Sequence, residues 1–205
     1  MTENVFDEKS ATWDDDPAKV ERAAKVADAI RDAMPLGPSV RLLEYGAGTG
    51  LVTQALRSAV GSVTLADTSA GMRGVMQAKI DGGVLTDAQV SDMDLAAGPL
   101  PEPEPHERFD LIVTVLALHH IPHLAPVLAN FAALLSPGGH VAIVDFDRED
   151  GSFHGDGFAG HHGFDHDALS ADLTTAGFHD VTFRPCHHVI RDSRPYPMFL
   201  ALATR

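Results

Sequence analysis

Three glycines at alternate positions follow a glutamate in the run LLEYGAGTG. The glutamate is Glu44, and the glycines are Gly46, Gly48 and Gly50. Residues without a Cβ let the main chain approach a ligand closely, and a helix that begins after such a turn directs unpaired N–H groups at that ligand. The run therefore predicts a cradle for a nucleotide-like ligand, in preference to a tight connection that binds nothing.

Two common nucleotide-binding motifs do not describe this run. The dinucleotide fingerprint needs G-x-G-x-x-G, and Leu51 stands where its third glycine belongs. A P-loop needs a Gly-Lys pair followed by Ser or Thr, and the lysine is absent. A different kind of nucleotide-like ligand is therefore favoured.

Further polar side chains stand at the ends of two expected strands. Asp67 ends the second of them, where a carboxylate can accept hydrogen bonds from both hydroxyls of a ribose; its alternative role is to cap the next helix. His119 and His120 follow the fourth expected strand, at the edge where ligands gather in open α/β sheets. Imidazole suits proton transfer near neutral pH, so both are candidate general bases. Packing or a place beside a cofactor is the alternative.

The 12 histidines of the chain suggest a metal site at first sight. Four of them, His154, His161, His162 and His166, lie among aspartates in one stretch. However, His162 and His166 straddle Asp165, the expected cap of a helix, and no H-E-x-x-H motif occurs. We therefore expect that this stretch binds no metal and forms a substrate pocket or a solvated loop. A chelator should leave the activity unchanged.

The elements that position these residues alternate along the chain, and this order predicts a mostly parallel sheet covered on both faces. Expected strands are 40–46, 62–67, 88–93, 109–115, 140–146, 179–185 and 197–204. Expected helices are 17–34, 51–59, 122–135 and 165–176. The proline-rich run 99–107 and the glycine-rich run 147–163 are expected to be loops.

The glycine run after a strand, E-x-G-x-G-x-G, resembles the first motif of class I S-adenosylmethionine-dependent methyltransferases. The runs FDLIVTVLALHHIP and SPGGHVAIVDF resemble the fourth-strand and fifth-strand segments of the same family, so the likeness covers about residues 40–146. Both flanks resemble small-molecule methyltransferases of the ubiquinone-biosynthesis type. The resemblance implies a doubly wound, Rossmann-like sheet of seven strands with an antiparallel last strand and an N-terminal helical cap.

The resemblance also implies S-adenosylmethionine as cofactor and direct displacement of its methyl group onto a small-molecule acceptor. It assigns the methionine end of the cofactor to Glu44, Tyr45, Gly46, Ala47, Gly48, Thr49 and Gly50, together with backbone at Val115 and Leu116. It assigns the ribose to Asp67 and the adenine to Asp92 and Met93, with Asp94 as an alternative. Thr68 and Met72 stand where relatives have varied residues; they are further candidate cofactor contacts, with a helix cap and a core methionine as their alternative roles. Trp13, His120 and Tyr196 are expected to line the substrate pocket.

Charge and cysteine content restrict the partners. With 29 acidic and 15 basic side chains, the formal net charge is −14, which disfavours nucleic acids and anionic membranes. Cys186 is the only cysteine, so an internal disulfide is impossible and a reducing cytoplasm is expected. No run approaches the ~20 apolar residues that span a bilayer. We expect a cytoplasmic monomer or homodimer.

The chain is expected to form one methyltransferase domain over 1–205, with a cap segment 1–36, a cofactor-binding core 37–146 and a substrate-side region 147–205. Two other functions stay open. One is a non-catalytic S-adenosylmethionine-binding regulatory module, which would bind without turnover. The other is a nicotinamide-dependent oxidoreductase, against which the missing third glycine already counts.

Overall fold

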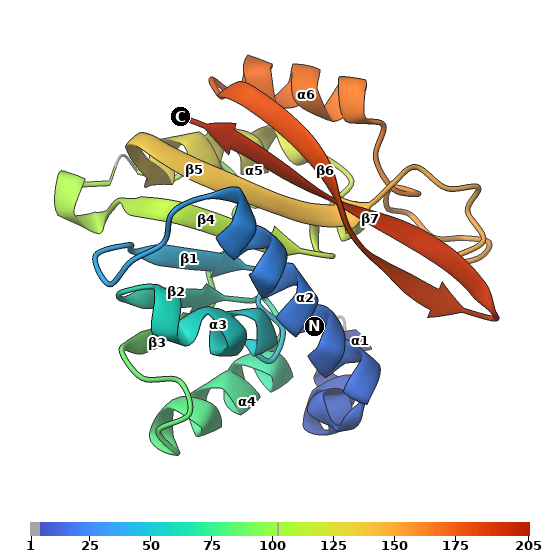
Figure 1. Ribbon diagram of the computed structural model, residues 1–205, viewed down its shortest axis with the longest axis horizontal. Helices are drawn as coiled ribbons and strands as arrows, with labels where there is room; N and C mark the ends of the chain where they lie inside the picture. Colours follow the sequence, from blue (N-terminus) through green and yellow to red (C-terminus); the bar gives the residue numbers. More distant parts are fainter. Residues whose placement is uncertain (1–4, 102) are drawn as a thin grey trace. The chain divides into compact units, whose positions relative to one another are not determined.

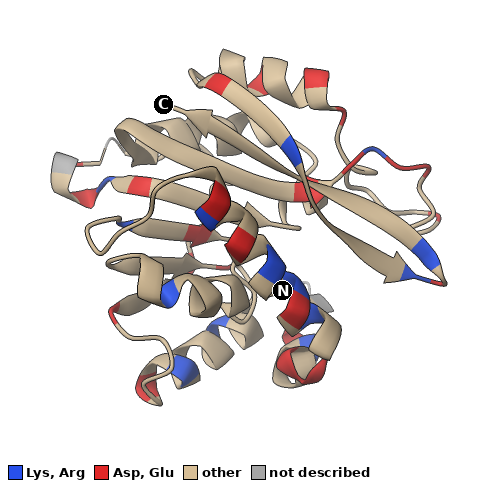
Figure 2. Ribbon diagram, viewed as in Figure 1, with Lys and Arg blue, Asp and Glu red and all other residues tan. Residues whose placement is uncertain are grey.

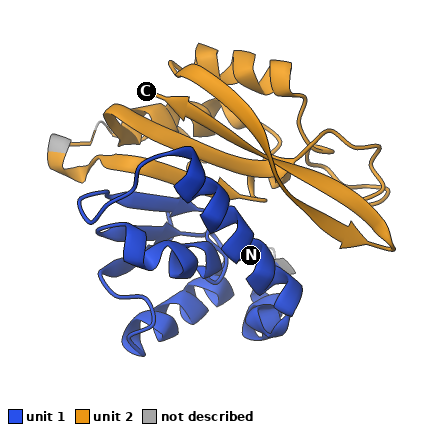
Figure 3. Ribbon diagram, in the orientation of Figure 1, with its two compact units in different colours: residues 1–94 blue, residues 95–205 orange. Residues whose placement is uncertain are grey.

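The computed structural model describes residues 5–101 and 103–205 (Figure 1). The chain divides into two compact units, Met1–Asp94 and Leu95–Arg205 (Figure 3). Each unit contains its own strands and helices, and we describe each by itself.

The first unit is a parallel three-stranded array with helices between the strands. Its elements are α1 (Val5–Lys9), η1 (Ser10–Asp15), α2 (Pro17–Ala33), β1 (Leu42–Tyr45), α3 (Leu51–Leu56), η2 (Arg57–Ala59), β2 (Val63–Ala66), α4 (Ala70–Asp81) and β3 (Ala88–Ser91). Leu42 pairs with Val63, which in turn pairs with Ala88. All residues of β1 and β2 are buried, while β3 is partly exposed.

The helix expected over 17–34 is confirmed as α2. Asp16 caps it by accepting a hydrogen bond from the Ala18 N–H at 3.0 Å, and Pro17 occupies the first turn, where a missing N–H costs nothing. Ala27 and Ile30 are fully buried, whereas Val20 is 43% exposed. The buried stripe of α2 therefore begins at Ala23.

The second unit holds the remaining strands and a long hairpin. Its elements are η3 (Pro105–Glu107), β4 (Phe109–Val115), η4 (Leu118–His120), α5 (Leu124–Leu134), β5 (Leu135–Phe146), α6 (His166–Thr175), β6 (His179–Arg191) and β7 (Arg194–Thr204). β4 and β5 are parallel, and β7 runs antiparallel to both β5 and β6. The strand order is β3-β2-β1 in the first unit and β4-β5-β7-β6 in the second. The predicted Rossmann-like α/β fold with an antiparallel last strand is thus confirmed.

Two boundaries differ from the sequence-based expectation. The segment SPGG, expected as a turn, belongs to β5, because Leu135 already pairs with Phe109 before the register shifts at Leu111. The last two strands are also longer than expected and meet at Asp192 and Ser193, whose φ angles are 50° and 63°. Such angles at both central residues give a tight hairpin turn that matches strand twist. Prolines along both strands lack the N–H of a sheet ladder, so the local sequence does not indicate this extension.

Among the described residues, no helix is both long enough and apolar enough to cross a membrane. Charged residues are spread over both units, and the segment after β5 carries Asp147, Glu149 and Asp150 around Arg148 (Figure 2).

Candidate functional site

The glycine turn of the first unit has an unusual backbone that is open on one side. Gly46, Gly48 and Gly50 have φ angles of 69°, 57° and 77°, which L side chains rarely adopt. A Cβ built on Gly48 would meet no atom within 4 Å. The main chain at Gly48 is therefore accessible to a ligand that must come close to the backbone.

Asp67, directly after β2, is hydrogen-bonded to this turn. One carboxylate oxygen accepts from the Gly48 N–H at 2.8 Å, and the other accepts from the Ser69 N–H at 2.8 Å. Burial raises the pKa of Asp67, and these two hydrogen bonds oppose that rise. Each oxygen keeps a second lone pair, so the carboxylate can accept hydrogen bonds from a ligand while it stays anchored.

Glu44 supports the turn from below. It is 3% exposed, and its Oε2 accepts from the Thr53 N–H at 2.9 Å in the first turn of α3. Burial raises its pKa to about 7, against the effect of hydrogen bonds from Thr53. The carboxyl group thus satisfies a helix-terminal N–H and holds α3 against β1.

Two aspartates of the N-terminal segment, neither of them expected at the site from sequence, reach the same region. Asp14 accepts from the Thr49 hydroxyl at 2.5 Å and pairs with Lys79 at 2.6 Å. Asp7 accepts from the Ser69 hydroxyl at 2.5 Å and from the Gly71 N–H at 2.9 Å. The segment is therefore fastened both to the glycine turn and to the start of α4.

Gly71 permits this close approach, and its replacement should release the segment. A Cβ at Gly71 would lie 2.7 Å from Ser10 Oγ and 2.8 Å from the Asp7 carbonyl oxygen. In Gly71→Ala we expect the amides of residues 5–15 to exchange at least about 10-fold faster. Gly74→Ala is the matched control, because a Cβ there meets nothing within 4 Å; it should leave this exchange unchanged. Equal exchange in the two variants would refute the fastening.

The remaining candidates of the first unit lie in different environments. Trp13 is half-buried, with Lys19 Nζ 4.0 Å from its ring centroid. Met72 is 1% exposed, whereas Thr68 is exposed. Asp92 is exposed and lines an open cavity of about 530 Å³ together with Arg73, Gly74, Gln77, Val90 and Ser91. The half-buried Met93 donates its backbone N–H to Ser91 Oγ at 3.2 Å.

In the second unit, the chain leaves β4 through a strained residue. Leu116 has a φ of 51°, a left-handed conformation that is unfavourable for a bulky side chain. Its N–H donates to the Val144 carbonyl at 2.8 Å, which holds the strained backbone in place. Strain of this kind concentrates at functional sites. Val115 and Leu116 are both half-buried.

His119 and Asp145 form a buried pair. The Nδ1 of His119 lies 2.7 Å from Asp145 Oδ1, and the two residues are 2% and 0% exposed. Asp145 also accepts from the Phe146 N–H at 2.8 Å and from the His119 N–H at 3.3 Å. The imidazole is thus oriented by a carboxylate, which donates nothing in its ionised form and so favours a proton on Nδ1.

The four histidines grouped by sequence have separate surroundings. His161 bonds the Ile121 carbonyl at 3.0 Å, and His162 lies 3.3 Å from Glu149. His166 bonds Asp147 at 2.8 Å. His154 instead lies beside His119 and His120, with ring centroids 5.1 and 5.3 Å away.

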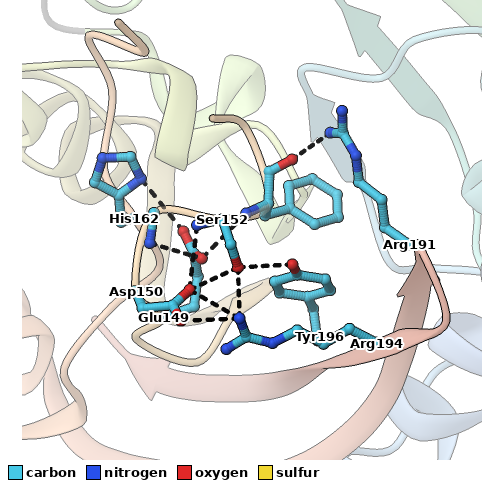
Figure 4. A network of polar contacts seen from close by, with 9 residues as sticks. Glu149, Asp150, Ser152, His162, Arg191, Arg194 and Tyr196 are labelled. Carbon is cyan, nitrogen blue, oxygen red and sulfur yellow. Dashed lines mark hydrogen bonds and ion pairs between the residues drawn. The ribbon is translucent and has the colours of Figure 1, made fainter. Parts of the chain in front are cut away.

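A polar network connects the loop after β5 to the end of the β6–β7 hairpin (Figure 4). The Tyr196 hydroxyl is 2.8 Å from Ser152 Oγ, and Arg194 pairs with Asp150 at 2.8 Å. Arg191 donates to the Phe153 carbonyl. Tyr196 is 4% exposed, so its ring packs under the loop and only its hydroxyl enters the network.

Comparison with known proteins gives the family. Residues 18–182 match the family model described as a methyltransferase domain. This chain belongs to the methyltransferase domain family. A 27-O-demethylrifamycin SV methyltransferase of Amycolatopsis mediterranei (strain S699) is 31% identical over 136 residues, which are 65% of this chain and 49% of that protein. The chain therefore spans about half the length of this curated relative.

Solved structures of methyltransferases share the fold of this methyltransferase domain. A chain from the complex between the Haloferax volcanii Trm112 methyltransferase activator and a methyltransferase has a TM-score of 0.76 at 18% identity, covering 100% of this chain and 99% of that one. A SAM-dependent methyltransferase from Aquifex aeolicus has a TM-score of 0.66 at 18% identity, covering 92% and 98%. The Aquifex protein, by its name, depends on S-adenosylmethionine.

The residues present in the methyltransferase domain fit that cofactor. At the turn, the main chain at Gly48 is open to a close-lying ligand, and the anchored carboxylate of Asp67 has free lone pairs. Ribose hydroxyls are donors that such a carboxylate accepts. Sequence reasoning did not find Asp7, Asp14 and Asp145, because each bonds a residue far away in the sequence. Only Asp145 could have been noticed, since it is an acid inside an apolar strand.

Proposed function

We propose that this protein is an S-adenosylmethionine-dependent methyltransferase that acts on a small-molecule acceptor by direct displacement. The hydrogen bond between Asp67 and the Gly48 N–H carries the proposal, because it combines the ribose acceptor and the open glycine turn in one rigid unit. We treat residues 1–205 as one methyltransferase domain, in keeping with a family match that extends over both compact units.

The proposed cofactor contacts retain the assignments made from sequence. The turn residues Glu44, Tyr45, Gly46, Ala47, Gly48, Thr49 and Gly50 and the backbone of Val115 and Leu116 serve the methionine end. Asp67 serves the ribose, Asp92 and Met93 serve the adenine, and Thr68 and Met72 are further cofactor contacts. The strained Leu116 supports its role, since an unfavourable φ is retained where the backbone must present a particular group.

The acceptor is proposed to be a small molecule in the cytoplasm. A formal net charge of −14 opposes binding of a polyanion such as nucleic acid. The rifamycin methyltransferase, by its name, acts on a small molecule, which supports the same acceptor class here. Trp13, His120 and Tyr196 remain the proposed substrate-side residues.

His119 is the proposed proton acceptor. S-adenosylmethionine, when bound, supplies a methyl group already activated on a positively charged sulfur. The protein's own contribution is then to orient the acceptor and to remove its proton. Asp145 Oδ1 lies 2.7 Å from Nδ1 of His119 and favours a proton on Nδ1. Nε2 is then left to take the proton of the acceptor. Asp145 is in this scheme a positioning residue.

Calorimetric titration with S-adenosylmethionine and with S-adenosylhomocysteine tests the proposal. Wild type should bind both, and Asp67→Ala should weaken both by about 10- to 100-fold, because a charge-assisted hydrogen bond is lost. Asp67→Asn, which keeps an acceptor oxygen, checks that the loss is not a folding defect. Asp28→Ala, on the exposed face of α2, should bind like wild type. Radiolabelled methyl transfer to a panel of small molecules then identifies the acceptor.

Two results would contradict the proposal in different ways. A folded wild-type protein that binds neither compound would exclude the cofactor. Binding without methyl transfer to any acceptor would favour the non-catalytic regulatory module.

A further inference from the structure

Three histidines from two segments of the second unit converge on one point. His119 and His120 belong to η4, and His154 belongs to the loop after β5. One ring nitrogen from each lies within 4.8 Å of the others. The sequence separation of 34 residues hid this group, because a tertiary contact rather than a motif assembles it.

His119 is prepared as a metal ligand by its carboxylate partner. Its Nδ1 is 2.7 Å from Asp145, and both side chains are buried. Metal-ligating histidines usually donate their second ring N–H to a carboxylate, which fixes the tautomer and turns the other nitrogen towards the metal. The Asp145–His119 pair reproduces that arrangement and leaves Nε2 for the ion.

His154 supplies an independent indication. Its Nε2 is buried and has no hydrogen-bond partner within the described part of the chain. Its ring is held by stacking on Phe158, with centroids 3.8 Å apart and planes 11° apart. A buried imidazole nitrogen without a partner is costly, and coordination of an ion would remove that cost.

We propose that His119, His120 and His154 bind a divalent transition-metal ion, with zinc as the representative. Neutral imidazoles suit zinc, copper, iron and nickel, whereas magnesium and calcium prefer oxygen ligands. Zn–N bonds of ~2.0–2.1 Å in a tetrahedral site require nitrogens about 3.3 Å apart. The three nitrogens must therefore close together on binding, which the loop position of His154 allows. A three-histidine site keeps a fourth position open for water or another ligand.

The ion has two consequences for this unit. It ties the loop 147–163 to η4 through His154. It also occupies the nitrogen of His119 proposed above to accept a proton, so zinc inhibits methyl transfer where that proposal holds. This inference opposes the sequence-based expectation of no metal, and one experiment decides between them.

The experiment titrates the chelator-treated full chain with zinc by calorimetry and with cobalt by visible absorption. Wild type should bind one ion with a roughly micromolar or lower Kd and show the absorption of tetrahedral cobalt. His154→Ala should weaken binding at least about 10-fold, and Asp145→Asn about 10- to 100-fold. His123→Ala, an exposed histidine at the start of α5, is the matched control and should bind like wild type.

Hydrogen exchange gives a readout that is independent of methyl transfer. Zinc should slow exchange of residues 147–163 in wild type and leave it unchanged in His154→Ala. Absence of stoichiometric binding by wild type would overturn the inference. So would His154→Ala binding zinc as tightly as wild type, since the ion would then sit on other histidines. Neither outcome affects the test of S-adenosylmethionine binding.

Discussion

Asp145→Ala should lower the free energy of unfolding by about 3–5 kcal/mol, measured by urea denaturation near neutral pH. Asp145 is fully buried and accepts hydrogen bonds from the His119 ring, the His119 N–H and the Phe146 N–H. Alanine removes the acceptor from three donors at once, and the buried ring of His119 loses its partner. Removing one member of a buried pair costs far more than the pair itself contributes.

Two further variants separate the pair from general effects of substitution. Asp145→Asn keeps an acceptor oxygen for the Phe146 N–H and should be destabilised less than Asp145→Ala. Asp156→Ala changes an exposed aspartate of the same unit and should stay within about 0.5 kcal/mol of wild type. If Asp145→Ala matched Asp156→Ala, the pair would not be buried in solution.

The same series tests the positioning role once an acceptor has been found. The folded Asp145→Asn variant should keep its affinity for S-adenosylmethionine. Its kcat should fall, and the acidic limb of its plot of kcat against pH should move. A structural role alone would leave the pH profile in place.

The parts of the fold that local patterns determine were predictable from sequence. Strand β4 has the predicted bounds, and Asp165 caps α6 as expected by accepting from the Ala168 N–H. These features depend on residues a few positions apart. The extension of the β6–β7 hairpin depends instead on pairing such as Tyr196 with Val189 and on contacts with Ser152 and Asp150, which no local pattern reveals.

The candidate site divides in the same way. The glycine turn and Asp67 could be proposed as cofactor-binding residues from sequence. A strand-turn-helix segment has a distinctive composition, and its residues lie a few positions apart. The fastening of Asp7 to Ser69 spans 62 residues and that of Asp14 to Thr49 spans 35 residues. Aspartates before a helix are usually caps, and Asp16 does cap α2, so nothing in the run of acids distinguished Asp14.

Glu44→Gln should remove a pH dependence of about 3 kcal/mol from the free energy of unfolding. Burial raises the pKa of Glu44 from its ordinary 4.5 to about 7 in the folded protein. Between these values the folded state binds more protons than the unfolded state, so stability falls as pH rises through this window. Below it, the carboxyl is protonated in both states. Above it, the folded protein carries a buried charge.

Glutamine has the shape of the protonated acid and can still accept from the Thr53 N–H, but it does not titrate. Urea unfolding of both proteins should therefore give similar stabilities at about pH 5, and at about pH 8 the variant should be more stable by up to about 3 kcal/mol. Glu8→Gln, at an exposed position of α1, should differ from wild type by the same amount at both pH values. A constant difference for Glu44→Gln as well would mean that Glu44 is ionised throughout. The hydrogen bonds from α3 and the other groups around Glu44 would then fully offset the cost of burying its charge.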